Sequence, residues 1–167
     1  MPARGRVPQH MIRTATLADL DAIAALHAEA RATYYRGHIP DEAFDGPAER
    51  ARNRAGWERA IGQGRVLCAE RDGVVAGTAA FGEVDGVMTL SQLHVAPARW
   101  RAGVGTELHA ACVEAWRGAG VRSARLEVFQ ENERAQAFYA RHGWYPDPDE
   151  PLAGNHLVLR FTVPADE

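Results

Sequence analysis

The spacing of apolar residues along the chain predicts four helices. Apolar positions recur every three or four residues after Thr16, and Asp19 stands at the capping-box distance from that threonine. A second helical segment, rich in Arg and Glu, is predicted over 48–61. A third is predicted from a stripe at intervals of four, made of Val104, Leu108, Cys112 and Trp116. A fourth begins after Asn132, a favourable N-cap residue, and is expected to stop at Gly143.

Extended segments and turn residues predict the strands. Asp-Gly pairs at 72–73 and 85–86 are strong hairpin signals, and they join three strands over 65–95 into an antiparallel meander. Further strands are predicted at 11–14, 123–129 and 156–162, with loops at 36–47 and 147–154. The resulting order, β-α-α-β-β-β-α-β-α-β, is an α+β fold with a mostly antiparallel sheet. The crossover at 87–129 should pair two parallel strands.

Length and composition indicate one globular domain. A chain of 167 residues suits a single core, which we place at 11–163 between tails at 1–10 and 164–167. The net charge of −3 argues against a nucleic-acid partner. There is no apolar stretch of membrane-spanning length and no signal-peptide core, so neither membrane insertion nor secretion is expected. The two cysteines are solitary, which favours the cytoplasm, and the seven histidines show no metal-binding spacing, so no metal is expected.

The most informative segment is the turn that joins the strand ending at Val95 to the next helix. The first N–H groups of a helix have no intrahelical partner and attract anions. Glycines let the backbone approach a phosphate closely, and Arg99 and Arg101 add positive charge. The residues that open this helix are Ala102, Gly103, Val104, Gly105 and Thr106. A tight turn without a ligand would use the same glycines, whereas a dinucleotide fingerprint is a poor match because Leu108 stands where its third glycine would be.

Taken as a whole, this part of the chain resembles the GNAT superfamily of N-acetyltransferases. The segment Leu93-x-Val95-x-Pro97, then Trp100-x-x-Gly103-x-Gly105 and Leu108, resembles the family's motif A. The segment Leu126-Glu127-Val128, then Asn132-x-x-Ala135-x-x-Phe138-Tyr139 and Gly143-Trp144, is similar to its second signature. The opening Ile12-Arg13-x-Ala15 with Asp19 also resembles the family, so the resemblance covers nearly all of 11–162. It departs at Trp100, where the family often has Gln or Arg, and this leaves open which arginine contacts the cofactor.

The resemblance implies the GNAT fold, a mixed, mostly antiparallel sheet of six or seven strands flanked by about four helices. It also implies that acetyl-CoA is the co-substrate and lies between the strand ending at Val95 and the strand at 123–129. The pantetheine arm would then pair with the backbone near Leu93, His94 and Val95. Further positions of the family that face the CoA arm and the thioester correspond to Asn132, Ala135, Phe138 and Tyr139.

The activity implied by the resemblance is transfer of an acetyl group to a primary amine, of a small molecule or a peptide, by direct attack in a ternary complex. Tyr139 is the candidate general acid because a phenol can protonate the leaving thiolate, although a tyrosine that only packs in the core is the alternative. Glu127 is the first candidate base, and His94, Glu83 and water are alternatives. A non-catalytic acyl-CoA-binding module and a transferase of longer acyl groups are alternative functions. Dimers are common among relatives, so a homodimer also stays open.

Overall fold

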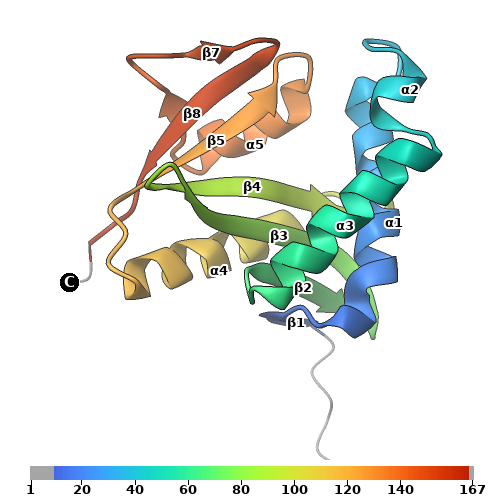
Figure 1. Cartoon of the computed structure of the whole chain (residues 1–167). Coiled ribbons are helices and arrows are strands. Elements are labelled where there is room, and N and C mark those ends of the chain that lie inside the picture. The colour runs from blue at the N-terminus through green and yellow to red at the C-terminus, as the bar shows by residue number, and fades with distance from the viewer. Residues whose placement is uncertain (1–9, 166–167) are drawn as a thin grey trace, which may run out of the picture.

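The computed structural model describes residues 10–165, which form one sheet with helices on both faces (Figure 1). The chain passes through the following elements: β1 (His10–Thr14), the 3-10 turn η1 (Leu17–Asp19), α1 (Leu20–Tyr35), α2 (Asp41–Phe44), α3 (Pro47–Gly62), β2 (Val66–Arg71), β3 (Val74–Val84), β4 (Val87–Val95), the 3-10 turn η2 (Pro97–Arg99), α4 (Val104–Gly118), β5 (Ser123–Phe129), α5 (Glu133–Arg141), β6 (Tyr145–Pro146), β7 (Leu152–Ala153) and β8 (His156–Thr162). No helix within this range is long and apolar enough to cross a bilayer.

The sheet confirms the expected fold class. Its strand order is β1-β2-β3-β4-β5-β8-β6, β7 pairs with β8 alone, and only β4 and β5 run parallel. Residues 10–165 form eight strands rather than six or seven, because β6 and β7 have two residues each and carry no apolar period. The segments expected as loops at 36–47 and 147–154 contain α2 and β7, which are likewise too short to show an apolar period. His10 already belongs to β1, while the rest of the expected N-terminal tail and the last two residues lie outside the described part of the chain.

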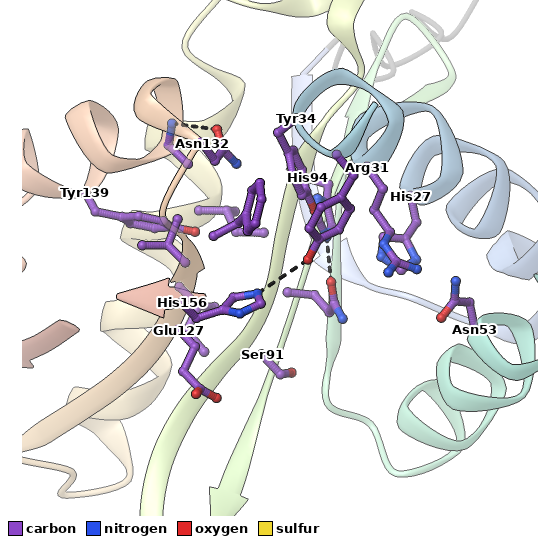
Figure 2. A pocket seen from close by; sticks show the side chains of 17 residues that line it. His27, Arg31, Tyr34, Asn53, Ser91, His94, Glu127, Asn132, Tyr139 and His156 are labelled. Atoms are coloured by element: carbon purple, nitrogen blue, oxygen red, sulfur yellow. Dashed lines mark hydrogen bonds between the residues drawn. The ribbon is translucent and has the colours of Figure 1, made fainter. Parts of the chain in front are cut away.

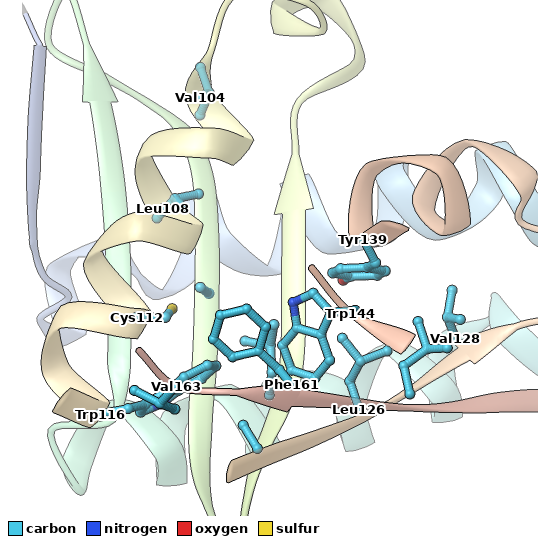
Figure 3. Close-up of a cluster of buried hydrophobic side chains, with 14 of the residues drawn as sticks. Val104, Leu108, Cys112, Trp116, Leu126, Val128, Tyr139, Trp144, Phe161 and Val163 are labelled. Atoms are coloured by element: carbon cyan, nitrogen blue, oxygen red, sulfur yellow. The ribbon is translucent and has the colours of Figure 1, made fainter. Parts of the chain in front are cut away.

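Two apolar cores lie on opposite faces of the sheet. Side chains alternate along a strand, and on β2 Val66 and Cys68 pack in the cluster under α1 and α3, whereas Ala69 packs in the cluster under α4. The α4 stripe expected from the sequence is buried in that second and larger cluster, together with Trp144 and Phe161 (Figure 3). The capping box at Thr16 and the cap at Asn132 are also present as expected.

The two parallel strands stay together only at their beginnings. Register pairs join β4 to β5 at Met88 with Ala124 and at Thr89 with Arg125, and none follows. Beyond this point the strands diverge (Figure 1). Ser91 lies in a bulge of β4. Phe81 pairs with Leu90 and Ala80 pairs with Gln92, so Ser91 between them has no partner in the register. Bulges bend and twist a strand, so this one helps to turn the end of β4 away from β5.

Candidate functional site

The turn before α4 has the geometry of an anion site. Gly103 takes a left-handed conformation, with φ of +81°, and Arg101 is also left-handed, with φ of +65°. The first helical hydrogen bond runs from the Glu107 N–H to the Gly103 carbonyl at 3.1 Å. The amides of 104–106 precede that bond, and no hydrogen-bond acceptor within residues 10–165 takes them up. These unpaired amides and the helix dipole therefore create a positive electrostatic potential in front of the turn.

The two glycines of the turn are needed for different reasons. Gly103 supplies the left-handed φ, and a Cβ there would meet nothing within 4 Å. Gly105 has no unusual φ, but a Cβ there would lie 3.2 Å from Cε2 of Phe138. Gly105 is thus the place where α5 packs closely against the start of α4.

A cavity of about 290 Å³ opens beside this turn and runs along the end of β4. Its walls come from α1, from β4 and the turn after it, and from one face of α5. The lining residues are Ala30, Thr33, Tyr34, Leu93, His94, Val95, Trp100, Arg101, Gly105, Asn132, Arg134, Ala135, Ala137, Phe138, Tyr139 and Arg141. Most of the side chains that the sequence assigns to acetyl-CoA are therefore brought together here; we call this space the β4–α5 cavity.

The remaining candidates of the turn lie outside that lining. Arg99 points to the β2–β3 hairpin, where it forms an ion pair with Asp72 at 3.7 Å. The Val104 side chain is buried in the core. The Thr106 hydroxyl lies 3.2 Å from Nε2 of His142, and Ala102 and Gly103 have little or no side chain to offer. These residues can serve a ligand through the backbone or through the turn itself.

Two arginines that sequence reasoning missed line the cavity from α5. The Arg134 guanidinium lies 3.4 Å from the centre of the Trp100 ring, and the Trp100 indole N–H donates to the Val95 carbonyl at 3.1 Å. Burial, followed by the charges of Arg101 and Arg141, lowers the pKa of Arg134. None of these three arginines has an acidic partner among residues 10–165, so their charges are left for an anion. The sequence does contain a signal for the two arginines of α5: Arg134 and Arg141 are seven residues apart, which places them on one face of the helix.

A second cavity, of about 330 Å³, lies between α1, α3, β4 and the end of β5 (Figure 2). We call it the α1–β5 cavity. Its lining residues are His27, Arg31, Tyr34, Tyr35, Asn53, Leu90, Ser91, Gln92, Leu93, His94, Glu127, Val128, Phe129, Asn132, Ala135, Tyr139 and His156. The Tyr35 hydroxyl lies 3.4 Å from Nε2 of His156, which links α1 to β8 across this space.

The two cavities meet at a small set of shared residues. These are Tyr34, Leu93, His94, Asn132, Ala135 and Tyr139. Tyr139 is buried, and its hydroxyl has no hydrogen-bond partner in the described part of the chain. Burial raises the pKa of Tyr139 and of Tyr34, so both are neutral phenols at physiological pH. Asn132 is occupied in capping α5, since its Oδ1 accepts from the Ala135 N–H at 3.2 Å.

The candidate bases occupy very different positions. Glu127 lines the α1–β5 cavity, but its side chain is 44% exposed, lies 3.6 Å from Arg125 and points away from Tyr139 (Figure 2). Glu83 is exposed on β3 and lines neither cavity. His94 stands at the junction of the two cavities.

His94 belongs to a chain of buried polar rings. Its Nε2 lies 2.5 Å from Oε1 of the Gln92 side chain, and in the tautomer that donates to this oxygen Nδ1 is the unprotonated nitrogen. Its ring centre is 4.7 Å from that of His27, whose Nδ1 accepts from the Trp57 indole N–H at 2.9 Å. Burial, then the charges of His27 and Arg31, lowers the pKa of His94 well below its usual value, which keeps the ring neutral. Among residues 10–165 no group of His, Cys, Asp and Glu side chains is arranged to hold a metal ion.

Comparisons with known proteins agree with this geometry. Residues 23–144 match the model of the acetyltransferase (GNAT) family. The PaiA N-acetyltransferase of Thermoplasma acidophilum, solved in complex with coenzyme A, is 17% identical and superposes with a TM-score of 0.83, covering 93% of this chain and 99% of that one. The yncA protein of Salmonella typhimurium, solved with its cofactor acetyl-CoA, is 21% identical with a TM-score of 0.68, covering 96% and 97%. No curated protein sequence matches the chain.

At these identities the solved structures establish the fold, and the family model adds the sequence evidence. Its match extends from within α1 to Trp144, three residues past the end of α5, and includes the anion turn and the junction of the two cavities. The chain belongs to the GNAT acetyltransferase family.

Proposed function

We propose that the protein transfers an acetyl group from acetyl-CoA to the primary amine of a small molecule, by direct attack within a ternary complex. The observation that carries this proposal is the meeting of two cavities at Tyr139, one of which borders the helix N-terminus at the turn before α4 while the other does not. A thioester entering from one side and an amine from the other would meet beside an unpartnered phenol.

The β4–α5 cavity suits coenzyme A. The free amides of 104–106 would bind the diphosphate, and Arg101, Arg134 and Arg141 would add charge for the phosphates. The last residues of β4 have no partner strand on the β5 side, so their backbone is free to pair with the pantetheine amides. The relatives solved with coenzyme A or acetyl-CoA support the same co-substrate.

Tyr139 would act as the general acid. When the amine has attacked the thioester carbonyl, the bond to sulfur breaks and a thiolate leaves, which needs a proton. The Tyr139 phenol keeps its proton because burial raises its pKa. The same burial raises the pKa of a thiol bound beside it, so the two groups stay close enough in acidity for the proton to move.

Position favours His94 over Glu127 as the group that receives the amine's hydrogen bond. His94 borders both cavities and offers an unprotonated nitrogen, whereas the Glu127 carboxylate points out of the α1–β5 cavity. A neutral, weakly basic imidazole binds the neutral amine, and water carries the excess proton away.

A thiol-release assay with acetyl-CoA and a panel of amines tests the proposal. We expect free CoA to appear only when an amine is added, with an N-acetylated product of matching mass. Propionyl-CoA and butyryl-CoA in the same assay measure acyl-chain preference. Tight binding of acetyl-CoA with no release on any amine would instead favour a binding module.

A further inference from the structure

The α1–β5 cavity has a buried arginine in one wall. Arg31 projects from α1, its side chain is 14% exposed, and its guanidinium lies 5.2 Å from the centre of the Tyr35 ring. Asn53 of α3 lines the same wall. Figure 2 shows both residues on the side of α1 and α3, with Tyr139 and Glu127 across the cavity.

The charge of Arg31 is only partly neutralised. Its NH1 lies 3.1 Å from Oε1 of Glu49, but Glu49 also forms an ion pair with Arg52, so two positive charges share one carboxylate. Glu49 itself does not line the cavity, and Glu127, on the opposite wall, is the acidic residue that does. The α1–α3 side of the cavity is therefore positive.

The charge of Arg31 lowers the pKa of the two neighbouring histidines, His27 and His94. After burial, the charge of Arg31 is the next cause that lowers the pKa of His27 to about 4, and it also contributes to the lowered pKa of His94. The field of Arg31 thus reaches the junction where the amine would stand.

We propose that the acceptor is a small amino acid or a close analogue, whose carboxylate binds Arg31 and Asn53 while its amino group faces Tyr139. The inference rests on the proposed function, because it names the substrate of that same site. A guanidinium matches a carboxylate in charge and in fork geometry. The cavity, at about 330 Å³, is at the small end of ligand sites, which suits an acceptor of this size.

The same charge has a second consequence for the reaction. A positive group near an ammonium favours the neutral amine, and the neutral amine is the nucleophile. Arg31 would therefore bind one end of the acceptor and ease the loss of a proton at the other. A polyamine would place a second cation beside Arg31 and is disfavoured.

Matched sets of amines test the proposal. Each set contains an amino acid, its carboxamide and its decarboxylated amine, assayed with acetyl-CoA by thiol release and by product mass. For at least one side chain we expect the acid to exceed its carboxamide in kcat/KM by about tenfold or more, as for one charge-assisted contact.

Variants assign that preference to Arg31. Arg31→Gln should bring the ratio of acid to carboxamide close to one, mainly through KM for the acid, with the Kd for coenzyme A unchanged. Arg31→Lys should keep part of the ratio, because it retains the charge without the fork. Glu49→Gln leaves Arg31 with less compensation and should preserve or raise the ratio. Arg36→Gln is the matched control, since Arg36 directly follows the helix that carries Arg31 but is exposed and lines neither cavity.

The outcomes separate this inference from the proposed function. If only amines without a carboxylate are acetylated, or if Arg31→Gln keeps the full ratio, the inference is wrong and the proposed function stands. If no amine at all is acetylated although acetyl-CoA binds, both are wrong.

Discussion

At the scale of single residues, the proposed chemistry depends on the hydroxyl of Tyr139. Tyr139 is the only tyrosine besides Tyr34 that borders both cavities, and its hydroxyl has no other partner among residues 10–165. A phenol that only packed in the core would be replaceable by phenylalanine at little cost. A tyrosine that acts as the general acid could not be replaced by phenylalanine without a loss of turnover.

Tyr139→Phe should therefore separate turnover from binding. We expect kcat to fall by about a hundredfold or more, as is usual when a general acid is removed. The Kd for coenzyme A, measured by calorimetry, should stay within about twofold, because the variant loses one oxygen and keeps the ring. Full activity in this variant would remove Tyr139 from the mechanism.

Gly105 provides a second test at this scale. A Cβ at this position would come 3.2 Å from the Phe138 ring, so Gly105→Ala must push α5 away from the start of α4. We expect the Kd for coenzyme A to rise by about tenfold, equivalent to about 1.4 kcal/mol, the order of a mild overpacking cost.

Gly118→Ala is the matched control for that prediction. Gly118 lies in the same helix, has an ordinary φ and would meet nothing within 4 Å. It should leave the Kd unchanged and stabilise the helix by up to about 1 kcal/mol. Equal effects of the two substitutions on binding would show that the contact with Phe138 is irrelevant.

At the scale of elements, α5 has two tasks. Its inner side carries Ala135 and Tyr139 to the junction, and its rim carries Arg134 and Arg141 to the β4–α5 cavity. Trp100 holds the rim in place, since it stacks under Arg134 and bonds to the carboxyl end of β4. Trp100, where the chain departs from the usual residues of the family, therefore contacts and positions Arg134 of α5.

Arg134→Gln tests this arrangement. It removes a charge and a stacked guanidinium from the rim of the cavity, so the Kd for coenzyme A should rise by about tenfold. The affinity should also become less sensitive to salt, because one of the charges that attract the phosphates is gone. Isothermal titration calorimetry with coenzyme A at low and at high salt concentration measures both effects.

The control for Arg134→Gln is Arg59→Gln in α3. Arg59 is exposed, lines neither cavity and carries the same charge. It should leave the Kd unchanged at both salt concentrations. If both variants weaken binding alike, the effect reflects net charge and not the rim of α5.

At the scale of the whole molecule, both sides of the sheet contain neutral, buried histidines. His27 packs on the α1–α3 side, and His109 belongs to α4 on the other side, where it accepts from the Trp144 indole N–H at 2.9 Å. Burial is the main cause that lowers the pKa of each to about 4. Each contributes fully to stability above the usual histidine pKa of about 6.5, and that contribution is lost as the pH falls from there toward 4.

Acidification should therefore destabilise the protein well before its carboxylates titrate. Between pH 7 and pH 5 we expect the free energy of unfolding to fall by about 2 kcal/mol for each of these two histidines. Asp19, whose pKa Arg13 holds at about 2, stays charged throughout this range. Urea unfolding at the two pH values gives the difference directly.

His109→Gln should reduce the difference in stability between pH 7 and pH 5 by about 2 kcal/mol. Glutamine can still accept from the Trp144 indole but does not titrate, so the contributions of His27 and His94 remain. A wild-type protein equally stable at pH 7 and pH 5 would contradict the assignment of both histidines as neutral and buried.

The sequence by itself determined the longer helices and strands and the turn before α4, but not the short α2, β6 and β7. Asp-Gly pairs required hairpins, a four-residue stripe required α4, and Gly103 required a left-handed turn at its start, because each of these is a local backbone or periodicity effect. The family motifs lie within those same segments, which is why the fold class and the family followed from them.

Only the tertiary structure decided which side chains share a cavity. Arg31, Arg134 and His94 are far apart in the chain, and Arg99 lies next to the turn yet points to another hairpin. No local rule contains this information, because it depends on how far β4 and β5 diverge after their two paired residues. That divergence brings α1 and α5 to the same opening in the sheet, and it made Glu127 a rim residue and His94 a junction residue.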